Sequence, residues 1–202
     1  MKRFGVILLI SGASGTGKTT VRDALVATVD NLHFSVSCTT RKSRDGEVEG
    51  RDYHFLSPEA FEARARAGEF LEYATVHENR YGTLRCTVEE SIRAGKDVLL
   101  DIDVQGARQI LNSTRETWLA PLLCTVFIAP PSLEELEKRL LHRGTDDPEV
   151  IRVRLANARQ ELQAWPAYQY RVVNDEVNRA AGDLQAILRA ARCRTTLLQS
   201  KR

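Results

Sequence analysis

The residue types with the clearest chemical use form one stretch near the start of the chain, Gly12-Ala13-Ser14-Gly15-Thr16-Gly17-Lys18-Thr19-Thr20. Its spacing fits the pattern G-x-x-x-x-G-K-[ST]. Glycines let backbone N–H groups curl around an anion, and a following helix adds unpaired donors and a partial positive charge. Lys18 can reach the β- and γ-phosphates of a nucleoside triphosphate, and the Thr19 hydroxyl can bind Mg²⁺. We therefore expect this stretch to bind a nucleoside triphosphate.

The elements that flank this loop have the order that the motif needs. An apolar run at 4–10 predicts a buried strand, and apolar positions from Val21 to Thr28 share one helical face. The sequence of strand, glycine-rich loop and helix separates a phosphate-binding loop from a glycine-rich turn that binds nothing.

Two carboxylates, Asp101 and Asp103, end a second apolar run at 98–103. Ligands of open α/β sheets bind beyond the carboxyl ends of the strands, and hydrated Mg²⁺ needs oxygen ligands. We expect both acids beside the phosphate loop. Capping of the helix predicted at 104–111 would explain one of them, but less easily both.

Basic residues gather in two further places. The polar stretch 38–53 carries Arg41, Arg44 and Tyr53, and a surface loop and a second anion site explain it equally well. Arginines also lie on two predicted helices on either side of the turn 144–148. A charge run is usually a solvated face, but this composition is also that of a lid that folds over phosphates.

The remaining patterns predict an α/β fold whose parallel sheet is flanked by helices. Further strands are expected at 33–37, 70–76, 124–128 and 170–173. Ser57-Pro58 is a helix start, capping boxes at 87–90 and 132–135 open two helices, a long helix follows 149, and an amphipathic helix closes the chain. Residues 81–83 are expected to form a turn, and the interval 37–95 a small mixed insertion.

Composition limits the other possibilities. The 202 residues can bury one substantial core, and a net charge of +2 does not indicate nucleic acid or a membrane as a partner. The four cysteines lack C-x-x-C spacing and the four histidines are scattered, which predicts reduced thiols in a cytoplasmic protein and no metal cage. The start of the chain resembles a secretory signal, but cleavage after it would destroy the phosphate loop.

From Ile10 to Asp175 the sequence resembles the guanylate kinases. The motifs that carry the resemblance are 11–20, 34–37 with Thr39-Thr40-Arg41, Gly46-Glu47-Val48, 50–53, Phe70-Leu71-Glu72, Tyr81-Gly82-Thr83, 100–103 with Gln105-Gly106, and 128–132. Two positions depart from the family pattern: Ala13, where proline is common, and the lid turn 145–148 with Pro148. Neither change removes a chemical group.

The resemblance implies a kinase that transfers phosphate from ATP to GMP, and to dGMP, with Mg²⁺. It implies a core of residues 1–36, 96–134 and 166–202, a GMP-binding part at 37–95 and a lid at 135–165. It also implies a set of site residues. These are Lys18, Arg139, Arg143 and Arg154 for catalysis; residues 12–20 with Asn174 for ATP; Thr19 and Asp101 for Mg²⁺; Arg41, Arg44, Tyr53 and Tyr81 for the GMP phosphate; and Ser37, Glu72, Thr83 and Asp103 for guanine.

The chemistry of guanine suits this set. One ionised carboxylate such as Glu72 can accept from guanine N1–H and N2–H₂ together, and adenine reverses that pattern. Two rivals stay open: a non-catalytic guanylate-kinase-like binding module, and a kinase of another phosphorylated substrate such as a ribose bisphosphate. The first has no need of Lys18 and Thr19, and the second has no use for Glu72 with Thr83. A GTPase is disfavoured because no Asn-Lys-x-Asp motif is present.

Overall fold

The computed structural model describes residues 2–76, 78–141 and 148–199. Its central sheet has the strand order β2-β7-β1-β8-β9, and all neighbouring strands are parallel. The strands are β1 (Ile7–Gly12), β2 (Leu32–Phe34), β7 (Asp97–Asp101), β8 (Leu123–Ala129) and β9 (Tyr170–Val173). Every residue of β1 and β8 is buried, as expected for parallel strands covered on both faces. The predicted fold class is confirmed.

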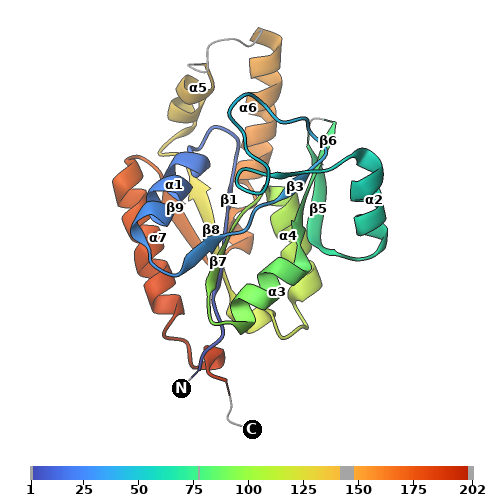
Figure 1. Cartoon of the computed structure of the whole chain (residues 1–202). Helices are drawn as coiled ribbons and strands as arrows, with labels where there is room; N and C mark the ends of the chain where they lie inside the picture. Colours follow the sequence, from blue (N-terminus) through green and yellow to red (C-terminus); the bar gives the residue numbers. More distant parts are fainter. Residues whose placement is uncertain (1, 77, 142–147, 200–202) are drawn as a thin grey trace.

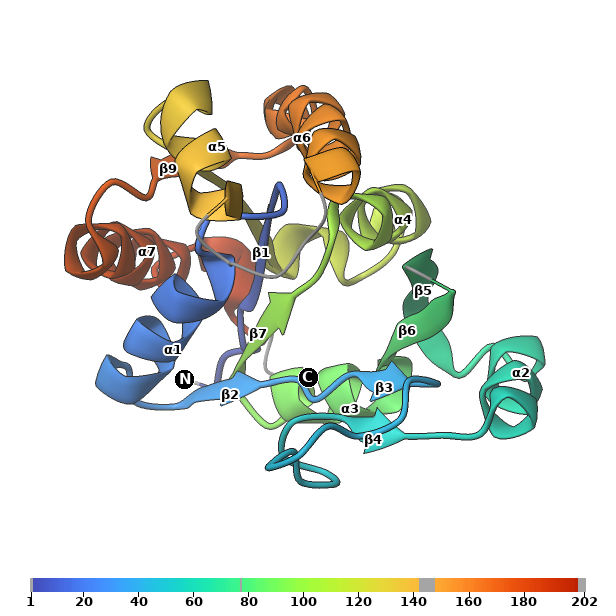
Figure 2. The same cartoon turned by 90° about the horizontal axis from the view of Figure 1, so that it is seen from above.

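Helices cover both faces of this sheet (Figure 2). The helices α1 (Lys18–Thr28) and α7 (Val177–Ala191) lie on one face, and α3 (Arg85–Arg93) and α4 (Val104–Thr114) on the other. Their apolar sides join the central strands in one large core. The described residues also include three short 3₁₀ helices, Ala120–Leu122, Trp165–Ala167 and Thr195–Leu197.

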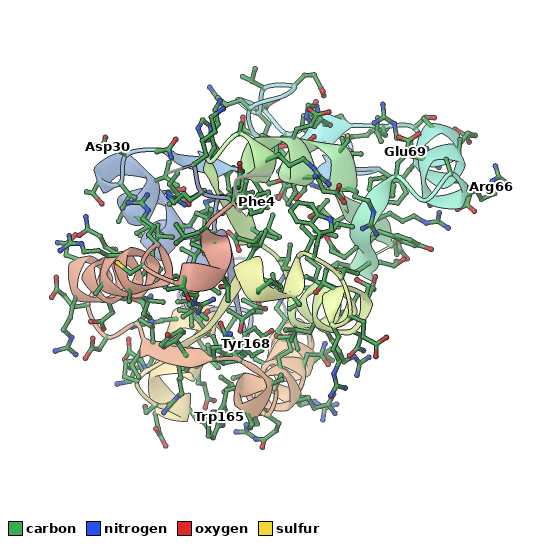
Figure 3. All side chains as sticks on the ribbon, turned by 90° about the horizontal axis from the view of Figure 1, so that it is seen from below. Phe4, Asp30, Arg66, Glu69, Trp165 and Tyr168 are labelled. Atoms are coloured by element: carbon green, nitrogen blue, oxygen red, sulfur yellow. The ribbon has the colours of Figure 1, made fainter. Side chains whose placement is uncertain are left out.

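A second, smaller sheet forms an arm beside the first (Figure 1). Its order is β4-β3-β6-β5, built from β3 (Cys38–Thr39), β4 (His54–Phe55), β5 (Phe70–Val76) and β6 (Asn79–Leu84). The helix α2 (Pro58–Arg66) packs on it through Phe61, whose ring stacks on Phe70 at 4.5 Å between centroids. Figure 3 shows Arg66 and Glu69 at the outer end of this arm, across the molecule from Trp165 and Tyr168.

Two helices stand beyond the carboxyl ends of the central strands: α5 (Leu133–Leu141) and α6 (Pro148–Leu162) (Figure 1). Leu136, Leu140 and Ala158 from these helices form a small apolar cluster with Ala13 of the phosphate loop. The helices therefore rest directly on the loop. No helix within the described ranges has both the length and the apolar composition to cross a membrane.

Three local predictions are wrong. Tyr81-Gly82-Thr83 is not a turn but lies inside β6, paired with both β3 and β5. The helix α3 begins at Arg85, after Leu84, and no side chain caps it, so the box at 87–90 lies within the helix. The strand predicted at 33–37 ends at Phe34. At 81–83, pairing with two neighbouring strands overrode the local turn signal of the glycine.

Candidate active site

The phosphate loop has the backbone shape that its glycines predict. Gly15 and Gly17 adopt φ of 86° and 81°, and α1 begins at Lys18 directly after Gly17. Gly12 has a different reason for lacking a side chain: a Cβ there would lie 2.4 Å from the Ile128 carbonyl oxygen of β8. The Thr16 side chain and backbone both donate to the Ala13 carbonyl, at 2.9 and 3.3 Å, which closes the loop. The result is an anion nest at a helix N-terminus.

Lys18 forms an ion pair with Asp101, the last residue of β7. The parallel pairing of β1 with β7 brings these groups together, because Ile10 lies opposite Asp101 in the sheet. Thr19 follows Lys18 on α1 and is exposed. The residues implied for phosphate and Mg²⁺ therefore lie at one end of the sheet.

Asn174 and Arg139 contact the backbone of the loop. The Asn174 side-chain amide donates to the Thr16 carbonyl at 2.7 Å, and Arg139 Nη1 donates to the carbonyls of Asn174 and Thr16 at 3.0 and 3.4 Å. Glu135 holds Arg139 Nε at 3.1 Å. Both side chains therefore stabilise the loop: Arg139 reaches it from α5, and Asn174 reaches it from the position after β9.

A cavity of about 1130 Å³ opens beside the loop. The loop residues 12–20 form one side, and α6 contributes Arg154, Asn157 and Glu161 to the other. Glu161 Oε2 accepts a hydrogen bond from the Ser14 N–H at 3.0 Å, so α6 already touches the loop. Such a cavity can hold a nucleotide whose phosphates lie in the nest.

A second cavity of about 170 Å³ lies between the arm and the central sheet. It brings together most of the side chains implied for GMP, together with Asp101. The members of the predicted set that line it are Ser37, Tyr53, Glu72, Tyr81 and Asp103. Thr83 lies behind Glu72 and donates to its Oε1 at 2.6 Å.

Glu72 is a buried carboxyl, with 6% of its surface exposed. Burial raises its pKa to about 7, the negative charge of Asp103 adds to that effect, and the hydrogen bond from Thr83 opposes it. Helix α4 can approach this carboxyl only because residue 106 is glycine: a Cβ there would lie 2.5 Å from Glu72 Oε2. Asp103 caps the same helix by accepting from the Gly106 N–H at 2.7 Å.

Of the residues implied for the GMP phosphate, Tyr53 and Tyr81 line this cavity, and Arg41 lies next to Tyr53. Arg41 Nη2 donates to Glu47 at 2.7 Å, and its guanidinium lies 5.3 Å from the centre of the Tyr53 ring. The Tyr53 and Tyr81 rings meet edge to face at 5.9 Å, and burial raises the pKa of Tyr53. Arg44 is exposed, and its N–H donates to Glu47 at 2.8 Å. The stretch 38–53 is therefore held by contacts among its own side chains and with Tyr81.

Arg143, with most of the predicted lid turn, lies outside the described residues. Arg22 and Glu161 reach the site but were not singled out from the sequence. Glu47 and Gly106 were named only as parts of family motifs, without a role. Arg22 lies four positions after Lys18 on a predicted helix, a spacing that places both on one face. For Glu161 no local signal exists, because the contact joins positions far apart in the chain.

A phosphate-binding loop at the carboxyl edge of a parallel sheet, next to a second cavity with a buried carboxyl, defines a P-loop nucleotide-binding protein. The family described as Guanylate kinase matches residues 5–191. The chain belongs to the guanylate kinase family.

Individual relatives agree with this assignment. The guanylate kinase of Sphingopyxis alaskensis is 45% identical over 192 residues, which cover 95% of this chain and 85% of that protein. The guanylate kinase of Paramagnetospirillum magneticum is 46% identical, with 95% and 87% covered. The crystal structure of guanylate kinase from Anaplasma phagocytophilum is 36% identical, covers 97% of this chain and 90% of that one, and superimposes with a TM-score of 0.78.

Proposed function

We propose that the protein is an ATP:GMP phosphotransferase, which converts ATP and GMP to ADP and GDP. One observation carries the proposal beyond family membership: an intact phosphate loop lies next to a cavity lined by the buried Glu72 carboxyl, itself bonded to Thr83. A donor triphosphate and a base-reading pocket in adjacent positions are what transfer between two nucleotides requires.

Guanine is the base that this pocket suits. An ionised Glu72 accepts from N1–H and N2–H₂, and the Ser37 hydroxyl donates to O6 or N7. The Thr83 hydroxyl can donate to the other acceptor only when its single proton leaves Glu72 Oε1. Arg41, Arg44, Tyr53 and Tyr81 bind the GMP phosphate, and Asp103 completes the base contacts. We expect dGMP to be accepted as well.

The loop 12–20 and Asn174 bind ATP, and Lys18, Arg139, Arg143 and Arg154 stabilise charge on the group in transfer. The GMP phosphate is already an anionic nucleophile, so the protein needs no general base. Positioning of the two substrates and neutralisation of their charge by these side chains supply the rate enhancement.

Mg²⁺ fits the oxygen ligands at this site. No cluster of three His, Cys, Asp or Glu exists among the described residues, and Mg²⁺ with ATP needs few protein ligands because phosphates and waters supply the rest. Thr19 and Asp101 would hold it, partly through water. The bound ion would neutralise charge on the phosphates.

The parts of the chain divide the work in this proposal. Residues 1–36, 96–134 and 166–202 form the core, residues 37–95 bind GMP, and residues 135–165 close over the phosphates. The protein acts in the cytoplasm on small molecules and needs no membrane or nucleic acid. None of its four cysteines forms a disulfide in the structure.

A coupled assay of ADP release tests this function. With ATP and Mg²⁺ present, GMP should support turnover, whereas AMP, UMP and a ribose phosphate should not. Lys18→Ala should lose turnover by orders of magnitude with little change in melting temperature, because Lys18 carries the charge that faces the transferred group. Preference for a ribose phosphate would favour the sister kinase, and absence of turnover with every acceptor would favour a binding module.

A further inference from the structure

Arg22 lies next to the phosphate loop but belongs to neither substrate site described above. It is four residues after Lys18 on α1, so the two side chains lie on the same face of the helix. Both reach one carboxylate: Lys18 contacts Asp101 Oδ1, and Arg22 Nη1 donates to Asp101 Oδ2 at 3.2 Å. Each oxygen of Asp101 therefore has its own cation.

The Arg22 guanidinium is held from two further sides. Its Nε and Nη2 atoms lie 2.9 and 2.7 Å from Asp23 Oδ1. Its central carbon lies 4.7 Å from the ring centre of Phe34, the last residue of β2, which packs against the main core. The group is thus fixed by the protein itself, without a substrate.

Asp101 needs such a partner. Only 6% of its side chain is exposed, compared with 20% for Lys18 and 23% for Arg22. An ionised carboxylate this deeply buried is costly when it loses its countercharge. Under the proposed function, Lys18 must turn from Asp101 to the phosphates of the nucleotide. When the nucleotide binds without Mg²⁺, this leaves Asp101 with one of its two cations.

We propose that Arg22 is a positioning residue that keeps Asp101 neutralised and in place when Lys18 moves to the nucleotide. Arg22 stays on Asp101 Oδ2 throughout, so releasing Lys18 does not leave a buried charge alone. Without Arg22, Asp101 competes with the nucleotide for Lys18. This inference rests on the proposed function, because it assumes that Lys18 binds nucleotide phosphates.

A double-mutant cycle tests the inference without any metal. ADP binding is measured by calorimetry in EDTA for the wild type, Arg22→Met, Asp101→Asn and the double variant. Arg22→Met should weaken ADP binding by about tenfold when Asp101 is present, and by less than about twofold in the Asp101→Asn background, where no carboxylate competes for Lys18. Arg22→Lys, which retains a cation, should recover most of the affinity.

Controls separate the possible failures. Arg66→Met removes an equally positive side chain at the outer end of α2 and should leave ADP binding unchanged, and melting curves verify that each variant is folded (Figure 3). An equal loss of ADP affinity in both backgrounds would overturn the inference, since Arg22 would then act on the nucleotide directly. No loss of affinity in Arg22→Met would overturn it as well. Failure of the wild type to bind ADP would instead contradict the proposed function.

Discussion

Glu72 is deeply buried, and in the proposed function its carboxylate accepts hydrogen bonds from two N–H donors of guanine. Glutamine at this position accepts through one oxygen only and turns an NH₂ group toward a guanine donor. Each opposed donor costs roughly 1–3 kcal/mol. Glu72→Gln should therefore lower kcat/KM for GMP at least tenfold, leave the apparent affinity for ATP little changed, and shrink the ratio of GMP to AMP activity. An unchanged ratio in steady-state kinetics would show that Glu72 does not read the base.

The raised pKa of Glu72 predicts that GMP affinity depends on pH. Because the pKa of Glu72 is about 7, its carboxyl is mostly protonated at pH 6 and mostly ionised at pH 8. Guanine needs the ionised form, so GMP affinity should rise by roughly tenfold between these values. The GMP phosphate also titrates near this range, so calorimetric titrations of Glu72→Gln supply the control. Equal pH profiles for both proteins would contradict the prediction.

Ionisation of Glu72 also affects stability without ligand. Unfolding returns this carboxyl to its ordinary pKa of 4.5, so between pH 4.5 and about 7 the folded protein binds more protons than the unfolded chain. The free energy of unfolding should therefore fall as pH rises through this window. The loss should be smaller in Glu72→Gln, and chemical denaturation at several pH values would measure the difference.

At the scale of elements, the pairing of β6 with its neighbours depends on Gly82. A Cβ at this position would lie 2.9 Å from the Phe70 ring and 3.1 Å from the Phe61 ring. Both rings are buried, so Gly82→Ala must displace them or the strand, at a cost of about 1–3 kcal/mol.

The same substitution should weaken GMP binding, because Tyr81 and Thr83 flank Gly82 on the strand. Urea denaturation measures the first effect and GMP titration the second. Gly182→Ala on α7, where a Cβ would meet no atom within 4 Å, is the matched control and should not lower stability. If Gly82→Ala were as stable as the wild type, the rings of Phe61 and Phe70 would be able to make room for the added methyl group at no cost.

At the scale of the whole molecule, Asp97 joins segments from both ends of the chain. Its fully buried carboxylate accepts from Arg3 Nη1 at 2.9 Å, from Arg192 Nε at 2.7 Å and from the Val6 N–H at 2.8 Å. The first strand and the end of α7 are therefore both tied to the start of β7. This contact lies outside the substrate cavities described above.

Asp97→Asn should destabilise the fold by about 2–4 kcal/mol, because it removes the charge shared by two arginines that are themselves partly exposed. The turnover of the folded variant at low temperature should be close to normal. Asp183→Asn, at an exposed position of α7, should change the melting temperature little. A melting temperature equal to the wild type's for Asp97→Asn would show that the cluster contributes no net stability.

Much of this protein is determined by short-range features of the sequence. The phosphate loop, the cap at Ser57, the strand at 124–128 and the amphipathic last helix follow from residue types and period, because each signal lies within a few turns or one strand. The strand predicted at 98–103 exists as β7 (Asp97–Asp101), but Asp103 lies beyond it and caps α4. The Ser57 hydroxyl accepts from the Ala60 N–H at 3.1 Å, as its position predicts. The residues implied for the substrates were predicted from the family motifs rather than from such local signals.

Only the tertiary structure decides which distant groups meet. Arg22 and Asp101 are separated by 79 positions in the sequence. Gly106 of α4 lies against the carboxyl of Glu72, which belongs to β5. The strand identity of Tyr81-Gly82-Thr83 also depends on two neighbouring strands rather than on the local glycine. The physical reason is that sheet order and helix packing set these contacts, whereas periodicity and capping act only along the chain.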